Sequence, residues 1–291
     1  MRVAVLGANG QLGTDVCAAY VQRGDNLFPL THDNFDVCDI DAGRTCLAAI
    51  RPNVIVNTTA MHQVDQCEQR PEESFAVNGV GARNLALISN DLDCVLVHVS
   101  TDYVFDGKKQ APYIESDCPF PLNVYGNTKL AGEIFVRTIA LRHFVVRVSA
   151  LFGGAPCRAK GGMNFVQLML HLARTRGKMR VVDDEFVSPT FTADAAAQIV
   201  ELSRTNDYGL YHATAEGHCS WHDFAQKIVE VGGVDAVLEV ADPGEFPAKT
   251  PRPKYSVLEN ANLKSVGKNI MPHWSEGLRR YLGMLSKSNI G

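Results

Sequence analysis

Long apolar runs are absent from this chain of 291 residues. No segment approaches the roughly 20 apolar residues that a membrane-spanning helix needs. The first ten residues, MRVAVLGANG, hold a short apolar run that ends at a glycine and is too short for a signal peptide. The sequence therefore predicts a cytoplasmic protein that has no membrane partner.

Runs of like charge are also absent, because no stretch holds five or more residues of one sign. The formal net charge is -4, so the chain has no broad electrostatic attraction to nucleic acid. We expect a small molecule as the partner, and no nucleic acid.

Paired C-x-x-C cysteines are missing, although the chain contains eight cysteines. Zinc knuckles and thioredoxin-like sites depend on that spacing, so both classes of site are disfavoured. Free and mostly buried thiols are the expectation, which suits a reducing compartment. The sequence predicts no structural metal site.

Short apolar strands alternate with amphipathic stretches through the first half of the chain. Strands that are apolar throughout, each followed by a helix, indicate a parallel sheet covered on both faces. The fold class that this pattern predicts is α/β, with a Rossmann-type doubly wound parallel sheet. The expected strands are 3–7, 26–30, 54–58, 95–100 and 144–149, and the expected helices are 11–23, 41–50, 72–89 and 123–140.

The pattern loosens after residue 150, where glycines and prolines separate helix-like segments near 163–175, 192–204, 221–231 and 274–285. We expect residues 1–150 to form the NAD(P)-binding Rossmann domain, with 192–204 returning to it. Residues 151–291 are then mainly a smaller C-terminal α/β substrate-binding domain.

A glycine-rich loop follows the first predicted strand and opens the first helix. It contains Gly7, Gly10 and Gly13 in a G-x-x-G-x-x-G spacing. Glycines let the backbone N–H groups approach a pyrophosphate at a helix N-terminus, where the dipole favours negative charge. The context of strand, loop and helix is the one that a dinucleotide-binding motif requires.

The end of the second strand leaves the choice between NADH and NADPH open. An acid for the ribose hydroxyls is expected there, and Asp33 is either that acid or an ordinary loop residue. No arginine stands at the strand end. In the next turn, Asp36 either bonds the amino group of adenine or starts a helix.

Tyr125 and Lys129 are four residues apart, so on a helix they share one face. An ammonium beside a phenol favours the phenolate, which predicts a lowered tyrosine pKa and a proton-handling pair. Thr101 stands at the carboxyl end of a strand, where open α/β sheets bind ligands. Its hydroxyl can hold a carbonyl while the tyrosine protonates the developing alkoxide.

Motifs spread over nearly the whole chain resemble those of the dTDP-4-dehydrorhamnose reductase family, within the extended short-chain dehydrogenase/reductase superfamily. Their combination and order are more specific than any one of them. They are the GxxGQLG loop, VDQCE at 64–68, STDYVFDG at 100–107, PLNVYGNTK at 121–129, Gly132-Glu133, and Arg252-Pro253.

The resemblance implies that a hydride passes from NADPH or NADH to C4 of a nucleotide-linked 4-keto-deoxysugar, with dTDP-4-dehydrorhamnose as the expected substrate. Tyr125 would be the general acid, Lys129 would hold its pKa and the cofactor ribose, and Thr101 would orient the carbonyl. Beside Tyr125 and Lys129, the residues that the resemblance places at the cofactor are Gly7, Gly10, Gln11, Leu12, Gly13, Asp36, Val37, Ala60, Met61 and His62. It places Thr101, Asp102 and Tyr103 at the sugar. Ala150, Asn164 and Arg252 are further candidates for contact with the sugar nucleotide.

His62 follows a strand end, so backbone contact with the cofactor is its expected role rather than catalysis. Asp65 and Glu68 lie at helical spacing and could cap a helix or form a pair. The resemblance also brings in a Mg²⁺ role for this acidic stretch and leaves a homodimer open.

The sequence departs from the family pattern at Ala150, where the family usually has a tryptophan that packs on the sugar. Exchanging a ring for a methyl group removes on the order of 100 Å² of contact surface, given the area that aromatic side chains bury. The segment 157–165 could compensate, with its cations at a diphosphate and Asn164 at a base or phosphate, or its charges could be solvated. Arg252 could also reach the diphosphate.

Two other functions remain open from the sequence. The family also contains a regulatory subunit of methionine adenosyltransferase, so a catalytically silent NAD(P)-binding subunit is one alternative. An epimerase or dehydratase on the same fold is the other. Dehydratases typically place paired acids beside the threonine, and Asp102-Tyr103 lacks that pair.

Overall fold

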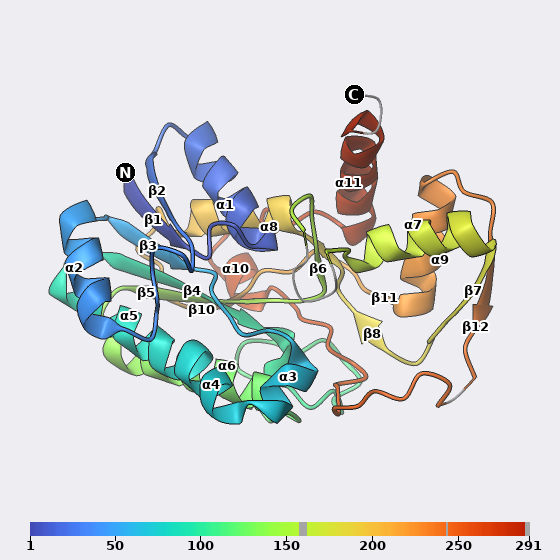
Figure 1. Ribbon diagram of the computed structural model, residues 1–291, viewed down its shortest axis with the longest axis horizontal. Helices are drawn as coiled ribbons and strands as arrows, with labels where there is room; N and C mark the ends of the chain where they lie inside the picture. The colour runs from blue at the N-terminus through green and yellow to red at the C-terminus, as the bar shows by residue number, and fades with distance from the viewer. Residues whose placement is uncertain (157–161, 243, 289–291) are drawn as a thin grey trace.

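Six parallel strands form the main sheet of the computed structural model, which describes residues 1–156, 162–242 and 244–288 (Figure 1). The strand order is β10-β5-β4-β3-β1-β2, with β3 and β4 at the centre of a doubly wound arrangement. The register pairs Val5 with Val56, and Val97 with Phe144. The strands are β1 Arg2–Leu6, β2 Asn26–Leu30, β3 Val54–Asn57, β4 Val95–Thr101, β5 His143–Val148 and β10 Gly209–His212.

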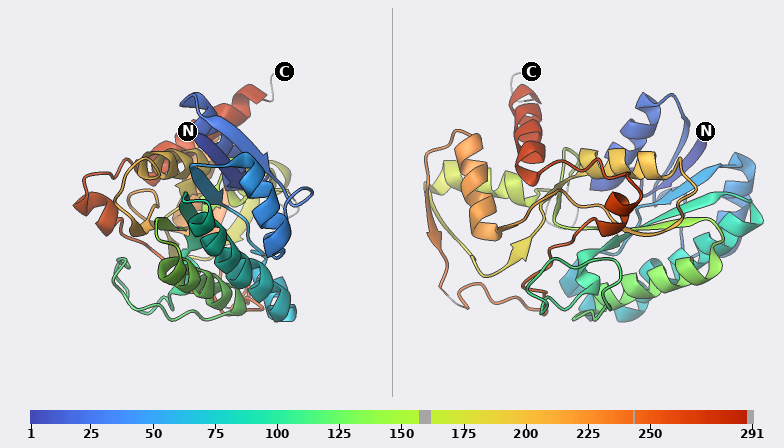
Figure 2. Two further views of the ribbon diagram at one scale, coloured as in Figure 1. Left: turned by 90° about the vertical axis from the view of Figure 1, so that its left-hand side faces the viewer. Right: turned by 180° about the vertical axis from the view of Figure 1, so that it is seen from behind.

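Helices cover both faces of this sheet, as the end-on view in Figure 2 shows. Alternate residues of β1 point to opposite faces, so Val3 and Val5 join one core and Ala4 and Leu6 the other. The first core packs against α1 (Gln11–Gln22) and α8 (Thr192–Leu202). The second packs against α2 (Ile40–Ile50), α5 (Gly81–Asp91) and α6 (Val124–Ile139). These layers confirm the predicted Rossmann-type fold class.

The expected helix 72–89 is interrupted by a π-helical turn. The chain runs through α3 (Val64–Gln69), α4 (Pro71–Phe75), the π turn η1 (Ala76–Val80) and then α5. A π turn adds a residue to the helical repeat and is frequent at functional sites. The apolar periodicity of the segment carries no sign of it.

A smaller lobe lies beside the carboxyl end of the sheet, to the right in Figure 1. Its core contains Phe152, Phe224 and Tyr281. The lobe is built from helices and short paired strands. These are β6 Leu151–Phe152, α7 Phe165–Arg176, β7 Lys178–Val181, β8 Phe186–Val187, β9 Thr190–Phe191, β11 Cys219–Ser220, α9 Trp221–Val231, β12 Val237–Val240 and α11 Trp274–Ser288.

The chain returns from the smaller lobe to the sheet twice. Helix α8 packs beside α1, as expected for 192–204, and strand β10 then pairs with β5 through Leu210 and Val145. Helix α10 (Ala261–Ser265) contacts β10. The strand at 209–212 was not among the expected strands, because it is only four residues long and contains a glycine and a histidine.

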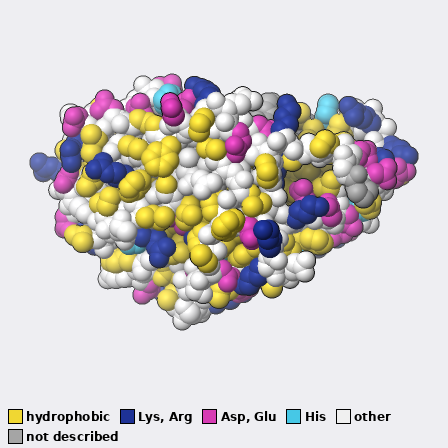
Figure 3. All heavy atoms as spheres, turned by 90° about the horizontal axis from the view of Figure 1, so that it is seen from below, with side chains coloured by type: hydrophobic (Ala, Val, Ile, Leu, Met, Phe, Trp, Pro, Cys, Tyr) yellow, Lys and Arg dark blue, Asp and Glu magenta, His cyan; other side chains and the backbone are white. Residues whose placement is uncertain are grey.

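The surface seen from below shows apolar side chains spread across this face of the molecule (Figure 3). Phe75 on α4 and Ile134 on α6 are among the exposed large hydrophobic residues. The homodimer stays a prediction. Of the described helices, none combines the length and the apolar character that crossing a bilayer requires. The seven described cysteines are free thiols, and three of them are buried (Cys67, Cys94 and Cys219).

Candidate active site

The glycine loop between β1 and α1 has the geometry of a dinucleotide cradle. Gly7 has a left-handed backbone (φ 74°), and a Cβ on Gly13 would lie 2.1 Å from the Gly7 oxygen. Gly10 is the N-cap of α1, and no side chain caps the first turn. The N–H groups at the start of α1 are thus left for an anion, which is the fit that a dinucleotide pyrophosphate needs. Leu12 is buried in the core, and Gln11 donates to the Ala155 oxygen at 3.4 Å.

Thr101 and Tyr125 meet beyond the carboxyl end of β4. Thr101 is the last residue of β4 and Tyr125 lies in the first turn of α6, and the Thr101 hydroxyl is near enough to the phenol to lower its pKa. The side chain of Asn123 caps this helix by accepting from the Gly126 N–H at 2.8 Å. Lys129, one turn further along, is buried and donates to the Val99 oxygen at 2.6 Å. The structure therefore brings the three predicted catalytic residues together.

The protonation chemistry of the pair differs from the expectation. Burial raises the pKa of Tyr125, and the hydrogen bond with Thr101 offsets only part of that rise. The ammonium of Lys129 is directed to the Val99 oxygen rather than to the phenol. The predicted lowering of the tyrosine pKa by lysine is therefore wrong for this structure. At neutral pH Tyr125 is a phenol that carries a proton to give.

Asp102 does not face an open site, contrary to the prediction that it contacts the sugar. Its side chain is buried and accepts hydrogen bonds from Thr101 at 2.9 Å and from Ser149 at 2.9 Å. Burial raises its pKa, while hydrogen bonds from Ser256, Ser149 and Thr101 lower it in part. Asp102 therefore orients the hydroxyl of Thr101 from the buried side of this residue.

Tyr103 and Arg252 come together beside Tyr125. The rings of Tyr103 and Tyr125 meet edge to face, with centroids 5.7 Å apart. Burial and the charge of Asp102 raise the pKa of Tyr103 to about 12, against the opposing effect of the Arg252 guanidinium. Arg252 is exposed and also lies near Glu185, whose pKa it lowers against the effect of burial. An exposed guanidinium at this place can bind an anionic group of a ligand.

The strand end at Ala60 and Met61 is fixed by a residue that sequence reasoning missed. The amide of Asn78, in the π turn, accepts from the Met61 N–H at 2.9 Å and donates to the Met61 oxygen at 2.9 Å. It also donates to the Thr128 hydroxyl on α6 at 3.0 Å. Asn78 thus links the expected cofactor contact to the helix that carries Tyr125. The π turn is the only local sign of this role, and it is visible in the structure rather than in the sequence.

The adenine-side residues form a compact turn after β2. The Asp36 carboxylate accepts from the Cys38 N–H at 2.9 Å, as a turn residue does. Val37 is buried, and its oxygen accepts from the Asn84 amide at 3.0 Å. Asp33 accepts from the Thr31 hydroxyl at 3.3 Å. Their contact with a cofactor stays a prediction.

Ala150 lies where the chain leaves β5 for the smaller lobe. Its backbone is left-handed (φ 43°), and its oxygen accepts from the Thr190 N–H at 3.2 Å. A side chain with a Cβ is strained in this conformation. Position 150, between β5 and β6, therefore holds a methyl group where the family pattern has an aromatic ring.

Asn164 has a structural role, contrary to its predicted contact with a base or phosphate. Its side chain is buried at the N-cap of α7 and accepts from the Gln167 N–H at 3.0 Å. The amide donates to the Gly153 oxygen at 2.9 Å and to the Tyr281 hydroxyl at 2.8 Å. All of its polar atoms are therefore engaged. The cations predicted to meet a diphosphate at Arg158 and Lys160 lie outside the described residues.

One residue of the acidic stretch in α3, Glu68, caps the start of α6. Glu68 accepts from the Val124 N–H at 2.7 Å, at the start of the helix that carries Tyr125, which confirms the capping alternative. Asp65 and Glu68 form no three-residue metal-ligand group in the described part of the chain. The Mg²⁺ role is not supported.

His62 has its imidazole Nδ1 3.4 Å from the Ala60 oxygen. This contact holds the ring against its own strand end rather than against Tyr125. The catalytic alternative for His62 therefore has no geometric support, and its backbone contact with a cofactor stays a prediction.

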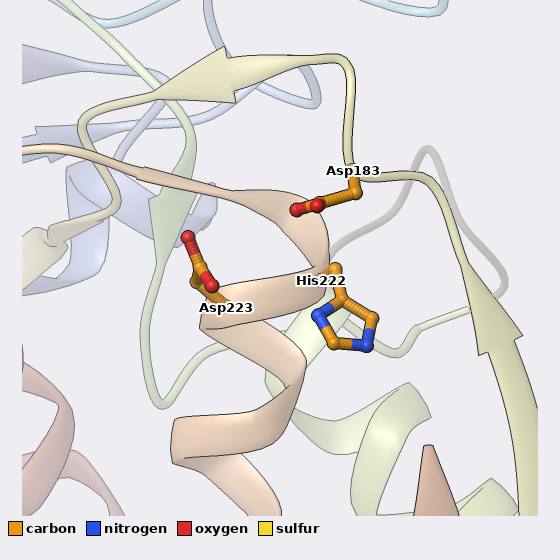
Figure 4. A group of neighbouring side chains, drawn as sticks. All are labelled: Asp183, His222 and Asp223. Carbon is orange, nitrogen blue, oxygen red and sulfur yellow. The ribbon is translucent and has the colours of Figure 1, made fainter. Parts of the chain in front are cut away.

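A group with metal-ligand chemistry lies in the smaller lobe (Figure 4). Asp183, His222 and Asp223 have ligand atoms within 4.8 Å of one another. Both carboxylates already serve the N-terminus of α9, because Asp183 accepts from the Ser220 hydroxyl at 2.5 Å and Asp223 accepts from the Ser220 N–H at 3.3 Å. These contacts are those of a helix cap.

Comparisons with known proteins agree with this geometry. The model of the RmlD substrate binding domain family matches residues 1–286. The spore coat polysaccharide biosynthesis protein SpsK of Bacillus subtilis is 38% identical over 97% of this chain and 96% of its own length. A dTDP-4-keto-6-deoxy-D-glucose reductase of Streptomyces niveus is 35% identical over 98% of both chains. The crystal structure of a dTDP-4-dehydrorhamnose reductase of Bacillus anthracis in complex with NADP matches with a TM-score of 0.91 and 37% identity, over 96% of this chain and 98% of that one.

Proposed function

Because the chain belongs to the dTDP-4-dehydrorhamnose reductase family of NAD(P)H-dependent oxidoreductases, we propose that it reduces the C4 keto group of dTDP-4-dehydrorhamnose to give dTDP-rhamnose. The observation that carries the proposal is the meeting of Thr101 and Tyr125 in front of the buried Lys129. The alternative of a catalytically silent subunit has no observation in its favour, since all three residues are in place.

The residues of this chain provide the proton and the orientation for the reduction. A bound reduced nicotinamide supplies the hydride. The phenol of Tyr125 gives its proton to the oxygen at C4, where negative charge develops, and its raised pKa keeps that proton available over the neutral range. Thr101 donates to Asp102 in this structure, so to hold the same oxygen its hydroxyl turns from Asp102 to the ligand. Lys129 holds the cofactor ribose beside the phenol.

The proposed cofactor is NADPH. The Bacillus anthracis relative binds NADP, and the glycine loop here offers the uncapped start of α1 to a pyrophosphate. Gly7, Gly10, Gln11, Leu12 and Gly13 form that loop. The remaining cofactor contacts that we propose are Asp36, Val37, Ala60, Met61 and His62, and the sugar-side contacts are Tyr103, Ala150 and Arg252.

An assay that crosses cofactors with substrates tests the function. NADH and NADPH are each supplied with dTDP-4-dehydrorhamnose, dTDP-4-keto-6-deoxyglucose and a UDP-4-ketosugar, and the loss of absorbance at the nicotinamide band is followed. We expect the fastest turnover with NADPH and dTDP-4-dehydrorhamnose. Tight NADPH binding without turnover of any ketosugar would instead identify the silent subunit.

Arg252 provides a prediction about substrate affinity. Arg252→Met should raise KM for the sugar nucleotide about 10- to 100-fold with little change in kcat, because a charge-assisted hydrogen bond to a phosphate contributes roughly 1.5–3 kcal/mol. Steady-state kinetics measures both constants. Lys249→Met, at an exposed position in the same segment, is the matched control and should leave KM unchanged. An unchanged KM in Arg252→Met would remove Arg252 from the substrate site.

A further inference from the structure

A buried glutamate lies on the same face of α6 as Tyr125 and Lys129, one turn deeper in the protein. Tyr125, Lys129 and Glu133 follow one another at intervals of four residues, so they lie along one face of the helix. Tyr125 is at the end near the ligand site, and the side chain of Glu133 is 0% exposed at the inner end. No step of the proposed reduction uses Glu133.

Glu133 is held by groups from two strands of the sheet. Ser100 on β4 donates to its Oε1 at 2.5 Å. Arg147 on β5 donates to Oε1 through Nε at 2.9 Å and to Oε2 through Nη2 at 2.7 Å. A two-pronged pair of this kind fixes the position of the carboxylate. Glu133 is therefore the buried partner of Arg147 in an ion pair inside the protein.

The surroundings of Arg147 hold it toward Glu133. Its guanidinium lies 5.0 Å from the centre of the Phe105 ring, and its Nη1 lies 3.4 Å from His212 Nε2. Burial and the charge of Arg147 lower the pKa of His212 to about 3, so this imidazole is neutral at working pH. Glu115 also faces Arg147, and burial raises its pKa.

Lys129 stands between this pair and the ligand site. Its ammonium donates to the oxygen of Val99, the residue before Ser100 on β4. Burial lowers the pKa of Lys129 to about 8, and the charge of Glu133 acts in the opposite direction. His98 on the same strand carries no compensating charge, because burial and Lys129 itself lower its pKa. Glu133 is the charged group that favours the ammonium form of Lys129.

We propose that Glu133, clamped by Arg147 and Ser100 one helical turn beyond Lys129, is a positioning residue that keeps Lys129 charged behind Tyr125. The proposal rests on the reduction proposed above, in which Lys129 acts beside the phenol. A buried ion pair contributes little to stability compared with apolar residues of the same volume. Its effect on Lys129 gives this pair a role that apolar residues cannot fill.

The test is the double variant Glu133→Gln/Arg147→Met, which removes the counter-charge of Lys129 without leaving Arg147 buried and unpaired. The apparent pKa of the alkaline limb of kcat/KM should fall by about one pH unit, at the low end of the shift that a neighbouring opposite charge gives. The single variant Glu133→Asp, which retains Arg147, keeps the negative charge. The apparent pKa of its alkaline limb should equal that of the wild type. Asp194→Asn, which breaks the remote pair with Arg280, controls for general destabilisation and should leave the limb in place.

A direct titration separates this inference from the proposed function. Protein labelled with ¹³C at lysine Cε is titrated by NMR, and the Lys129 resonance is identified by its absence in Lys129→Met. In the double variant the Lys129 resonance should titrate about one pH unit lower than in the wild type. An unchanged titration overturns the inference even if the enzyme is active. A wild-type protein that turns over no ketosugar overturns the reduction, while the titration still decides the role of Glu133.

Discussion

Tyr125→Phe should lower kcat roughly a thousandfold, within the range of about 10²–10⁴ that a positioned general acid contributes. The substitution removes the proton donor and leaves the ring, so the edge-to-face contact with Tyr103 is retained. The glycine loop is untouched, and the dissociation constant for NADPH should stay within a few-fold of the wild type. Stopped-flow turnover and a fluorescence titration with NADPH measure the two quantities.

Tyr113→Phe is the matched control for the loss of a tyrosine hydroxyl. The hydroxyl of Tyr113 donates to Asp106 at 2.8 Å and not to Thr101, Tyr125 or Lys129, so its removal should leave kcat nearly unchanged. If Tyr125→Phe retained kcat within a few-fold of the wild type, another group would have to supply the proton.

Gly126→Ala should lower kcat/KM about a hundredfold or more, because a displacement of about 1 Å at a catalytic group has an effect of that size. A Cβ on Gly126 would lie 2.2 Å from the Tyr103 oxygen and 2.9 Å from the Pro121 Cβ. The first of these atoms belongs to the backbone and cannot turn aside. The start of α6 must therefore move, and Tyr125 moves with it away from Thr101.

Gly283→Ala is the control for this substitution, since Gly283 lies in α11 and a Cβ there meets nothing within 4 Å. Alanine is favoured over glycine in a helix by roughly 1 kcal/mol, so the control should gain slightly in thermal stability and keep full activity. A Gly126→Ala enzyme with normal kcat/KM would show that α6 can adjust without moving Tyr125.

Much of the larger domain could be predicted from the sequence, because its strands are short apolar runs that the sheet buries on both faces. The segments of β1, β3, β4 and β5 all have this character. Strand β10 does not, since its backbone enters the sheet through packing with β5 while His212 finds a hydrogen-bond partner in the Glu259 oxygen. Tertiary contacts supply what the local pattern of this strand lacks.

In the candidate site, too, some residues could be predicted from local motifs and others could not. Thr101, Tyr125 and Lys129 lie in local motifs, and the structure brings them together. The resemblance predicts that Asp102 faces the sugar, and the segment that holds Asn164 is predicted to compensate for the missing tryptophan. The partners that occupy them, Ser149 for Asp102 and Tyr281 for Asn164, are distant in the sequence, so nothing local announces them.

The direction of the tyrosine pKa also depends on three-dimensional context. A spacing of four residues places Lys129 near Tyr125, but it does not say where the ammonium points or how deeply the phenol is buried. The carbonyl of Val99 takes the ammonium, and burial then decides the pKa of the phenol. This outcome suits a reduction, because the step requires a proton donor.

The late return of the chain at β10 has a consequence for biosynthesis. The sheet that carries Thr101 is complete only when residues 209–212 have paired with β5, well after the helices of the smaller lobe have begun. A ribosome-bound fragment that ends near residue 150 therefore has an open sheet edge at β5, and it also lacks α8, which covers one face. Such an edge invites pairing with other chains. The nascent protein should consequently gain protease resistance only after most of its length has emerged, and the two halves should not be obtainable as separately folded pieces.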